Sequence, residues 1–482
     1  MQLLKMLSFL GIVIMILGVA MFLPVFFGLY YGEEEWFVFL VASIFTFLVG
    51  LIVHKGTLRF KEDLHQREAL AMVTLSWLVG SLFSTIPYLF TKTLNSFSDA
   101  FFEAMAGITT TGASVIPDLE AVSQTVLFWR SLSHWLGGMG IIVLFIALVS
   151  TLKMGGTQLF RAEIPGSIVQ KLKPRISQTA LILWITYVIM TIILFFLLWM
   201  SGMPFFDALC HALVTVATSG CSIKNASIGF YDSSLIYWVI TIFMFLAGSN
   251  FALFYLAIKE KSLRTFWRNV EFRFYFRAVL FFILIFAVHL IFVEDLNLGN
   301  ALTLASFKVI SAITTTGFTI YDYENWSSFL QTILIVLMFI GGCNGSTSGS
   351  IKIGRYIIIF KQALAELRQA IHPRAVLNLK VDGKFVEESI LINAFSYFFL
   401  FIFFTILGTL FLTFLGLDML TSFSATVASI TNTGLGFSLV GPGQNFSVLP
   451  DAGKYALAFL MLLGRLEIYT VLVVFSLGFW KK

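Results

Sequence analysis

Long apolar runs separated by short polar segments dominate the sequence. A helix needs about 20 apolar residues to cross the hydrocarbon core of a membrane. Runs of that order lie near residues 6–30, 36–54, 70–90, 125–150, 180–200, 235–258, 278–293, 329–360, 390–415 and 455–480. This pattern predicts an all-α polytopic membrane protein with ten spans. The first run is longer than the apolar core of a signal peptide and is therefore interpreted as a span.

Shorter apolar segments lie between these runs and end in short stretches rich in hydroxyl groups and glycine. Segments such as 98–108 and 204–216 cannot cross a membrane and are predicted to be half-helices that enter it and stop. We call the stretches that follow the glycine segments. They read Ile108-Thr-Thr-Thr-Gly112, Ala217-Thr-Ser-Gly220, Ile313-Thr-Thr-Thr-Gly317 and Ile430-Thr-Asn-Thr-Gly434.

The glycine segments recur at similar intervals, which indicates an internal repeat. Each unit would hold a span, a half-helix that acts as a pore helix, a glycine segment and a second span. Residues 1–66 form a leading pair of helices outside the repeat. The four predicted units are 67–175, 176–272, 273–384 and 385–482. Because the units share one orientation, they can surround a single pseudo-fourfold pore.

The residue types of the glycine segments suit an ion filter. Irregular backbone is tolerated at membrane depth only where it is buried or lines a water-filled cavity. Rings of carbonyl oxygens can replace the hydration shell of potassium, and the negative ends of the half-helices would face the cation. One such segment alone would be typical of a helix C-cap, but four in register favour a filter. The candidate potassium-contacting residues are Thr110, Thr111, Gly112, Thr218, Ser219, Gly220, Thr315, Thr316, Gly317, Asn432, Thr433 and Gly434.

Composition and charge sharpen this picture. The chain is 58% hydrophobic and 12% charged, with a mean hydropathy of +0.92, so it cannot cover a soluble surface. Lys and Arg gather after the second, fourth, sixth and eighth spans, whereas Glu33–Glu35 and Asp322–Glu324 lie in the alternate loops. The positive-inside rule then places both termini in the cytoplasm and the glycine segments toward the outside. The basic segments 153–178 and 259–277 would meet lipid head groups or an acidic cytosolic partner.

Other kinds of chemistry find little support in the sequence. The three cysteines show no metal-binding or disulfide spacing. We find no catalytic constellation, no nucleotide-binding pattern and no sign of nucleic-acid binding. The chain is therefore predicted not to be an enzyme and to carry no cofactor, with potassium as its substrate.

A glycine-rich stretch at 341–350 interrupts the eighth apolar run and weakens its helix. It lacks the Gly-Lys-Ser/Thr ending of a phosphate loop. It is either a flexible connector or an unwound loop that gates the pore from below, and we favour the gate. The candidate gating residues are Gly341, Gly342, Asn344, Gly345, Ser346, Gly349 and Arg465.

Six further charged or polar residues call for an interpretation. Arg465 lies in the last span, where a charge marks either function or a structural bond to loop carbonyls or to Glu467. Arg130 is expected to pair with Asp99 or Glu103, and Lys352 to mark the cytoplasmic boundary. Asp207 is expected to cap its half-helix. His134 and His211 are expected to be packed and hydrogen-bonded.

The four glycine segments, together with Trp135-Leu-Gly-Gly-Met-Gly140 and Leu463-Gly-Arg-Leu-Glu467, resemble the TrkH branch of the Trk/Ktr/HKT potassium transporters. The resemblance covers essentially the whole chain, including the leading pair. It implies potassium uptake across the bacterial inner membrane, a gate formed by the loop and Arg465, a homodimer, and a cytosolic TrkA-like ring of nucleotide-binding subunits. The Ala217–Gly220 segment departs most from the pattern. The alternative is a symporter driven by protons or sodium, although no carboxylate is convincingly placed within a span.

Overall fold

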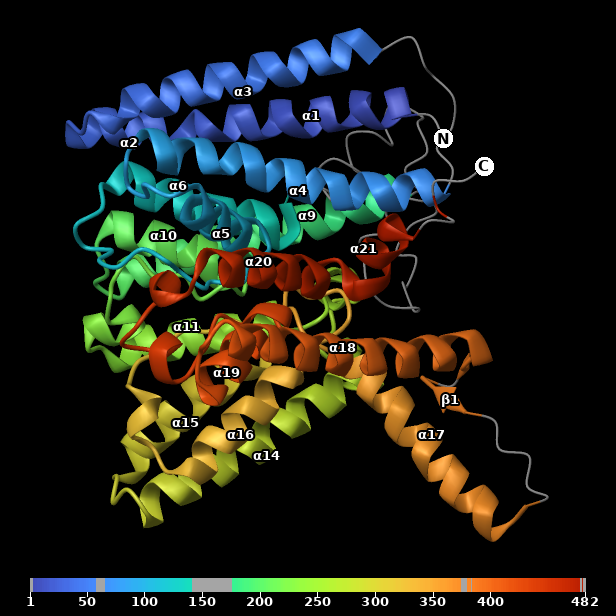
Figure 1. Ribbon diagram of the computed structural model, residues 1–482. Helices are drawn as coiled ribbons and strands as arrows, with labels where there is room; N and C mark the ends of the chain where they lie inside the picture. The colour runs from blue at the N-terminus through green and yellow to red at the C-terminus, as the bar shows by residue number, and fades with distance from the viewer. Residues whose placement is uncertain are drawn as a thin grey trace.

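The computed structural model describes residues 3–57, 66–140, 176–373, 379–382, 384–476 and 479. Within these ranges the chain is almost entirely helical (Figure 1). The predicted all-α membrane fold is therefore confirmed. The segment 141–175, with the second half of the fourth predicted span and most of the first large basic segment, lies outside the described residues, as do Arg59, Lys61 and the two C-terminal lysines.

The chain begins with α1 (Leu3–Met21), α2 (Leu23–Tyr31) and α3 (Glu35–Thr57), which lie along one edge of the molecule (Figure 1). Small residues allow α1 and α3 to approach closely. A Cβ atom on Gly11 would come within 2.7 Å of the Gly50 carbonyl oxygen, and Ser43 donates a hydrogen bond of 2.8 Å to the Gly18 carbonyl. Close backbone approach of this kind is how helices associate in a membrane.

The elements that follow alternate long helices with short ones. The first half of the remaining chain contains α4 (Gln66–Phe90), α5 (Phe97–Ile108), α6 (Gln124–Trp135), a π-helical turn (Leu136–Gly140), α9 (Ile176–Met200), α10 (Phe205–Val216), a 3-10 turn (Ser227–Tyr231), α11 (Ser234–Ala247), α12 (Phe251–Glu260) and α13 (Arg264–Arg268). The second half contains α14 (Val270–Phe292), α15 (Leu298–Ile313), α16 (Ser328–Phe339), α17 (Ile353–Ile371), the hairpin strands β1 (Lys380–Val381) and β2 (Lys384–Phe385), α18 (Glu388–Phe414), α19 (Met419–Ile430), α20 (Asp451–Arg465) and α21 (Glu467–Phe475), with short 3-10 turns at Tyr323–Asn325, Ser438–Val440 and Phe446–Val448.

Several predicted spans are not single straight helices. Among the described residues, six helices are long and apolar enough to cross a membrane, or up to eight if each of two bent pairs counts as one span. The axes of α11 and α12 differ by 92°, and those of α20 and α21 by 119°. The eighth predicted span is likewise divided into α16 and α17 by the glycine-rich stretch. The interruption of the eighth run was expected from the sequence, whereas the bends within the sixth and tenth predicted spans were not.

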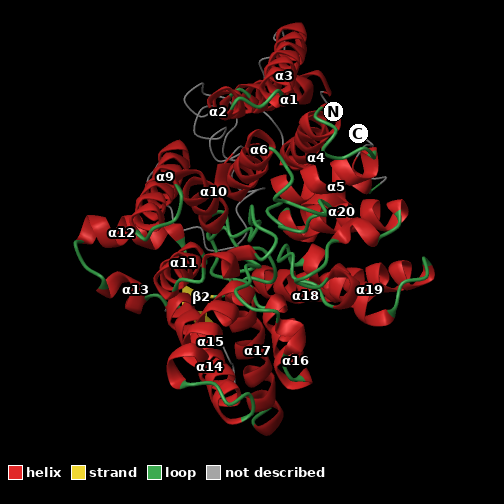
Figure 2. Ribbon diagram, turned by 90° about the vertical axis from the view of Figure 1, so that its left-hand side faces the viewer, coloured by secondary structure: helices red, strands yellow, loops and turns green. Residues whose placement is uncertain are grey.

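Four short helices, α5, α10, α15 and α19, lead into the glycine segments. The first two start within one residue of the predicted half-helices and end where these were predicted to end. Their last turns are buried, because the helices enter the protein rather than run along its surface. The non-helical segments gather at the centre of the molecule, with the helices around them (Figure 2).

Candidate ion-conduction site

The four glycine segments share one unusual backbone conformation. In each, the residue two before the glycine and the glycine itself have positive φ, and the residue between them does not. The φ values are 55° and 79° at Thr110 and Gly112, 52° and 63° at Thr218 and Gly220, 55° and 89° at Thr315 and Gly317, and 53° and 70° at Asn432 and Gly434. Such values are costly for a residue other than glycine. Alternation of handedness lets successive carbonyl groups point to one side, as a carbonyl-lined filter requires.

The four segments also form a closed ring. A Cβ atom added to Gly112 would overlap the carbonyl oxygen of Ser219, in the next segment. The same holds for Gly220 and Thr316, for Gly317 and Thr433, and for Gly434 and Thr111. Each glycine therefore lies against the following segment, and the last lies against the first. Glycine is required here both by its positive φ and by the lack of space.

Hydroxyl groups hold three of the four segments in the same way. The hydroxyls of Thr109 and Thr111 lie 2.8 Å apart, those of Thr314 and Thr316 2.7 Å apart, and those of Thr431 and Thr433 2.8 Å apart. The second segment has Ala217 at the first of these positions, so Ser219 instead donates to the Val214 carbonyl at 3.2 Å. The departure predicted for this segment therefore lies in its hydroxyl bonding, whereas its backbone follows the others.

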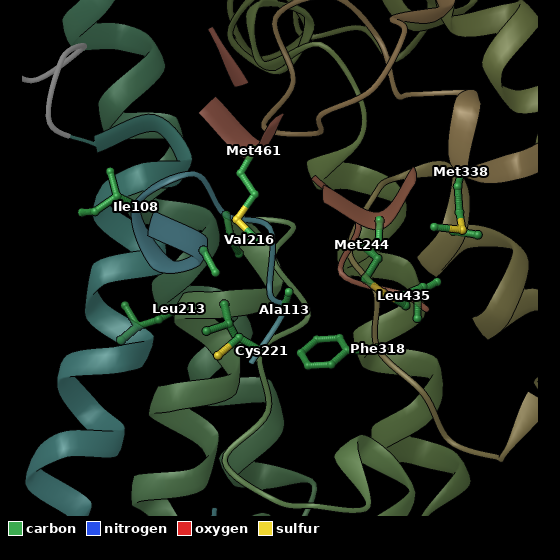
Figure 3. Close-up of a cluster of buried hydrophobic side chains, with 14 of the residues drawn as sticks. Ile108, Ala113, Leu213, Val216, Cys221, Met244, Phe318, Met338, Leu435 and Met461 are labelled. Carbon is green, nitrogen blue, oxygen red and sulfur yellow. The ribbon is translucent and has the colours of Figure 1, made fainter. Parts of the chain in front are cut away.

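The residues that directly follow the four glycines are packed in the hydrophobic core. The residues that follow the four glycines are Ala113, Cys221, Phe318 and Leu435, and all four are buried in one core cluster (Figure 3). The three cysteines of the chain are buried and free.

The glycine-rich loop between α16 and α17 lies directly against the ring of glycine segments. The Gly349 amide donates to the Thr315 hydroxyl at 2.7 Å, and a Cβ atom on Gly349 would overlap the Thr431 carbonyl. Thr347 donates its hydroxyl hydrogen to the carbonyl of Val216, the last residue of α10, at 3.0 Å. The loop thus contacts the second, third and fourth pore helices or their glycine segments.

Two elements hold this loop in place from its other side. The Cys343 amide donates to the Gly248 carbonyl at 2.8 Å, and the Phe251 amide to the Gly345 carbonyl at 3.1 Å, so the loop fills the break between α11 and α12. A carboxylate oxygen of Glu271, in the first turn of α14, accepts hydrogen bonds from the amides of Asn344 at 2.7 Å and Gly354 at 3.1 Å. Glu271 was not singled out from the sequence, because nothing local distinguishes it from Glu260 in the same basic segment.

Arg465, the last residue of α20, connects this loop to the opposite side of the site. Its guanidinium donates to the Thr347 carbonyl at 2.7 Å, to the Gly137 carbonyl at 2.8 Å, and to the Gly138 carbonyl. It therefore bonds loop carbonyls, one of the two structural partners considered from the sequence. Glu467 instead pairs with Arg355 of α17, at 2.6 Å.

Lys352 does not mark a solvent boundary, contrary to our expectation. Its side chain is buried, with 4% of its surface exposed. The ammonium group turns back into the loop and donates to the Ser348 carbonyl, with the Ser346 hydroxyl 3.4 Å away. Hydropathy alone could not show this, because the lysine directly follows the polar loop in the sequence.

The remaining predicted contacts have mixed outcomes. Arg130 pairs with Glu103 at 2.6 Å, one of its two expected partners, whereas Asp99 pairs with Lys454 at 2.6 Å. Asp207 does not cap α10, whose cap residue is Pro204.

The polar groups near these helices find other partners. Asp207 accepts a hydrogen bond of 2.7 Å from the Tyr231 hydroxyl. His211 is buried and hydrogen-bonded, 3.0 Å from the Ser222 hydroxyl. His134 is buried, but its Nδ1 atom has no hydrogen-bond partner among the described residues, so this part of the prediction is wrong.

No group of three or more His, Cys, Asp or Glu in the described part of the chain could hold a metal ion. A potassium ion at the glycine segments would instead meet backbone carbonyls and hydroxyls. It would be the substrate and not a resident metal.

A multi-pass helical protein with a ring of four glycine segments, closed from one side by a loop and an arginine, has the architecture of a membrane cation transporter. The family described as TrkH, cation transport protein, matches residues 37–480. The chain belongs to this family, which confirms the resemblance found in the sequence. The family is one of transporters, so the chain is not an enzyme.

Curated relatives match over almost their full length. The Trk system potassium uptake protein TrkH of Salmonella typhimurium is 36% identical over 98% of both chains. The Trk system potassium uptake protein TrkG of Escherichia coli strain K12 is 36% identical, over 98% of this chain and 97% of its own. The crystal structure of the potassium transporter TrkH from Vibrio parahaemolyticus superimposes with a TM-score of 0.90, at 31% identity, over the whole of both chains.

Proposed function

We propose that this protein takes up potassium through a filter formed by its four glycine segments. The observation that carries the proposal is the closed ring in which the four segments repeat one pattern of φ angles. Four copies of one backbone conformation would give the rings of carbonyl oxygens that select potassium. The names of the full-length relatives support the choice of ion. The predicted units 67–175, 176–272, 273–384 and 385–482 would each supply a quarter of this pore.

We propose that the loop at 341–350 and Arg465 form the gate. The loop lies against the glycine segments through Gly349, and Arg465 ties Thr347 to the backbone at Gly137 and Gly138. A fixed positive charge below the filter would repel a potassium ion. Opening would then require the loop and Arg465 to separate.

Potassium flux into liposomes tests the filter and its energy source together. Purified protein should carry potassium down a gradient of potassium alone, without sodium and without a pH difference. No flux under these conditions, even with a cytosolic regulatory partner supplied, would favour the symporter. Gly317→Ser should lower the ratio of potassium to sodium flux, because its side chain would displace the Thr433 carbonyl. The matched control is Gly443→Ser, at a glycine with no neighbouring atom within 4 Å of an added Cβ.

We further propose that the protein lies in the bacterial inner membrane with both termini in the cytoplasm. The start of α1 and the end of α21 lie at the same end of the molecule (Figure 1). The exposed basic residues of α12, α13 and the turn between them would then face the cytosol; they are Lys259, Lys261, Arg264 and Arg268. A TrkA-like nucleotide-binding ring is proposed as their partner, and a response of the flux to ATP or NADH only when that ring is added would test this.

A homodimer is proposed from the surface of α17. This helix leans away from the rest of the molecule (Figure 1). It exposes an apolar stripe of Phe360, Leu364, Leu367 and Ile371, with exposed fractions of 58%, 55%, 64% and 72%. The same stripe on a second copy would cover these side chains.

A further inference from the structure

A ring of hydrogen bonds surrounds the outer ends of the four glycine segments. We call these ends the exits, because the polypeptide chain leaves each segment there. In each segment the carbonyl of the residue two positions after the glycine accepts a hydrogen bond. The four acceptors are Ser114, Ser222, Thr319 and Gly436. Their donors are the Phe446 amide at 2.8 Å, the Arg130 guanidinium at 2.7 Å, the Ile228 and Gly229 amides at 3.1 and 3.3 Å, and the Tyr323 hydroxyl at 2.6 Å.

Each donor belongs to the predicted unit that precedes the acceptor's unit around the pore. Arg130 of the first unit bonds the exit of the second, and Tyr323 of the third bonds the exit of the fourth. Phe446 of the fourth unit bonds the exit of the first, which closes the ring. The acceptor is therefore a backbone carbonyl at the same position in all four units, whereas the donor is a backbone amide in two of them, a guanidinium in the third and a hydroxyl in the fourth. We call this ring of bonds the exit belt.

We propose that Arg130 and Tyr323 are positioning residues that set ion selectivity by holding the exit belt. They are the two donors that act through side chains, so substitution can remove their bonds without altering the backbone. This proposal rests on the proposed function, because it assumes that ions pass along the glycine segments. Neither residue contacts the ion itself. Each fixes the backbone at the outer end of a neighbouring segment.

Arg130 is held at the belt by a buried carboxylate. The Arg130 and Glu103 side chains have 3% and 1% of their surface exposed, and they pair at 2.6 Å. Glu103 also accepts from the Val115 amide at 2.9 Å, directly beside the belt carbonyl of Ser114. The pair thus joins the exits of the first and second segments. A buried ion pair is costly to form, which suggests that it is kept for the geometry it imposes.

Tyr323 is held by a different set of contacts. Its ring is buried and packs edge-on against Phe437, with ring centroids 5.2 Å apart. The ammonium group of Lys308, from the pore helix α15, lies 3.6 Å from the centre of the Tyr323 ring. Lys308 Nζ has no hydrogen-bond partner among the described residues, so the ring is its contact in this site. The lysine and the tyrosine therefore connect the third pore helix to the fourth exit.

The physical reason for a selectivity effect is rigidity. Carbonyl oxygens discriminate potassium from sodium only if their number and spacing are maintained around the ion. A released exit carbonyl can turn, and the segment before it can then adapt to the smaller ion. Loss of one belt bond should therefore act on selectivity more than on the amount of folded protein.

The test compares two tyrosine variants in liposomes. Tyr323→Phe keeps the ring over which Lys308 lies and removes only the hydroxyl that bonds Gly436. Tyr356→Phe is the matched control. The hydroxyl of Tyr356, in α17, donates to the carbonyl of Phe339, the last residue of α16, and this bond is not part of the belt. We expect Tyr323→Phe to lower the potassium to sodium flux ratio by about threefold to tenfold, the effect of one hydrogen bond. Tyr356→Phe should leave that ratio unchanged.

Arg130→Lys supplies the second variant, because it keeps a positive charge beside Glu103 but shortens the reach to the Ser222 carbonyl. It should lower the flux ratio with little change in the thermal unfolding midpoint. An unchanged ratio in both variants, with Gly317→Ser impaired, would overturn the exit belt and leave the filter standing. If Gly317→Ser were also unchanged, the filter proposal itself would fail. Failure of both belt variants to fold would assign these residues to stability and overturn the proposal.

Discussion

At the residue scale, Arg465 places a positive charge where the proposed function requires a cation to pass. Its guanidinium bonds the carbonyls of Thr347, Gly137 and Gly138 below a ring proposed to carry cations. Hydrogen bonds to a charged group contribute about 1.5–3 kcal/mol each. The same contacts that order the site therefore oppose ion passage in two ways, by charge and by tethering the loop.

Arg465→Ala should raise potassium flux, since it removes both the charge and the tether. Arg465→Lys keeps the charge but lacks the planar fork that reaches several carbonyls, so its flux should lie between that of Arg465→Ala and the unaltered protein. Tracer uptake into liposomes measures both. Equal flux in all three proteins would return Arg465 to a purely structural role.

Sequence reasoning at this scale succeeded where a residue type is demanded by the backbone. The glycines were recognised because a positive φ and close packing leave little alternative to this residue type. A Cβ atom added to Gly220, for example, would overlap the Thr316 carbonyl oxygen. Lys352 was misplaced although its partners Ser348 and Ser346 are close in sequence, because the sequence does not show that its side chain turns back into the loop. Tyr323 was missed because its partner lies far along the chain. No local pattern reveals that the Tyr323 hydroxyl reaches Gly436.

At the element scale, the loop at 341–350 is attached to α14 by a single carboxylate. Glu271 accepts the amide hydrogens of Asn344, within the loop, and of Gly354, in the first turn of α17. A movement of α14 would therefore move the loop as well. This helix directly follows the exposed basic segment of α13, so a cytosolic partner bound there would be well placed to act on the proposed gate.

Glu271→Ala should raise basal potassium flux and weaken its control by a regulatory partner, because the loop and the first turn of α17 each lose a hydrogen bond to α14. A shift of about 1.4 kcal/mol changes an equilibrium tenfold, so loss of two such bonds should be readily measured. Glu271→Gln is the control, since its amide oxygen can still accept. Flux through liposomes, with and without the partner, distinguishes them, and an unchanged Glu271→Ala protein would contradict the coupling.

Helix ends could be predicted from the sequence only where the residue types change along the chain. The end of α5 at Ile108 was predicted because the hydroxyl-rich segment begins there. The bend between α20 and α21 was not, because the apolar run continues through it. That bend occurs where Glu467 adopts a φ of 54° and pairs with Arg355. The break between α11 and α12 likewise depends on the loop that fills it.

At the scale of the whole molecule, the central feature is a ring built from segments distant in sequence. Gly434 lies against Thr111, near the other end of the chain. The repeat made a ring predictable, since equivalent units tend to pack equivalently. It did not reveal the order of contacts around the ring or the lean of α17, which depend on packing between units.

The orientation and the dimer can be tested with single cysteines, because Cys210, Cys221 and Cys343 are buried and should react little. Glu34 and Lys259 are both exposed, at opposite ends of the polarity set by the positive-inside rule. In intact cells, a membrane-impermeant thiol reagent should label Glu34→Cys at once, and Lys259→Cys only after permeabilisation. The reverse order would contradict cytoplasmic termini.

In the same panel, Leu364→Cys on the apolar stripe of α17 should form a disulfide between two copies on mild oxidation. Lys259→Cys, exposed but off the stripe, should not form this disulfide and serves as its control. The comparison of the two variants is needed because lipid could cover the apolar stripe as well as a second copy could. The stripe consists of Phe360, Leu364, Leu367 and Ile371. If lipid covers the stripe, neither variant should cross-link, which would exclude this face as the dimer contact. A second copy would cross-link only the stripe. Since α17 begins just after the loop at 341–350, such pairing would also restrain the proposed gate.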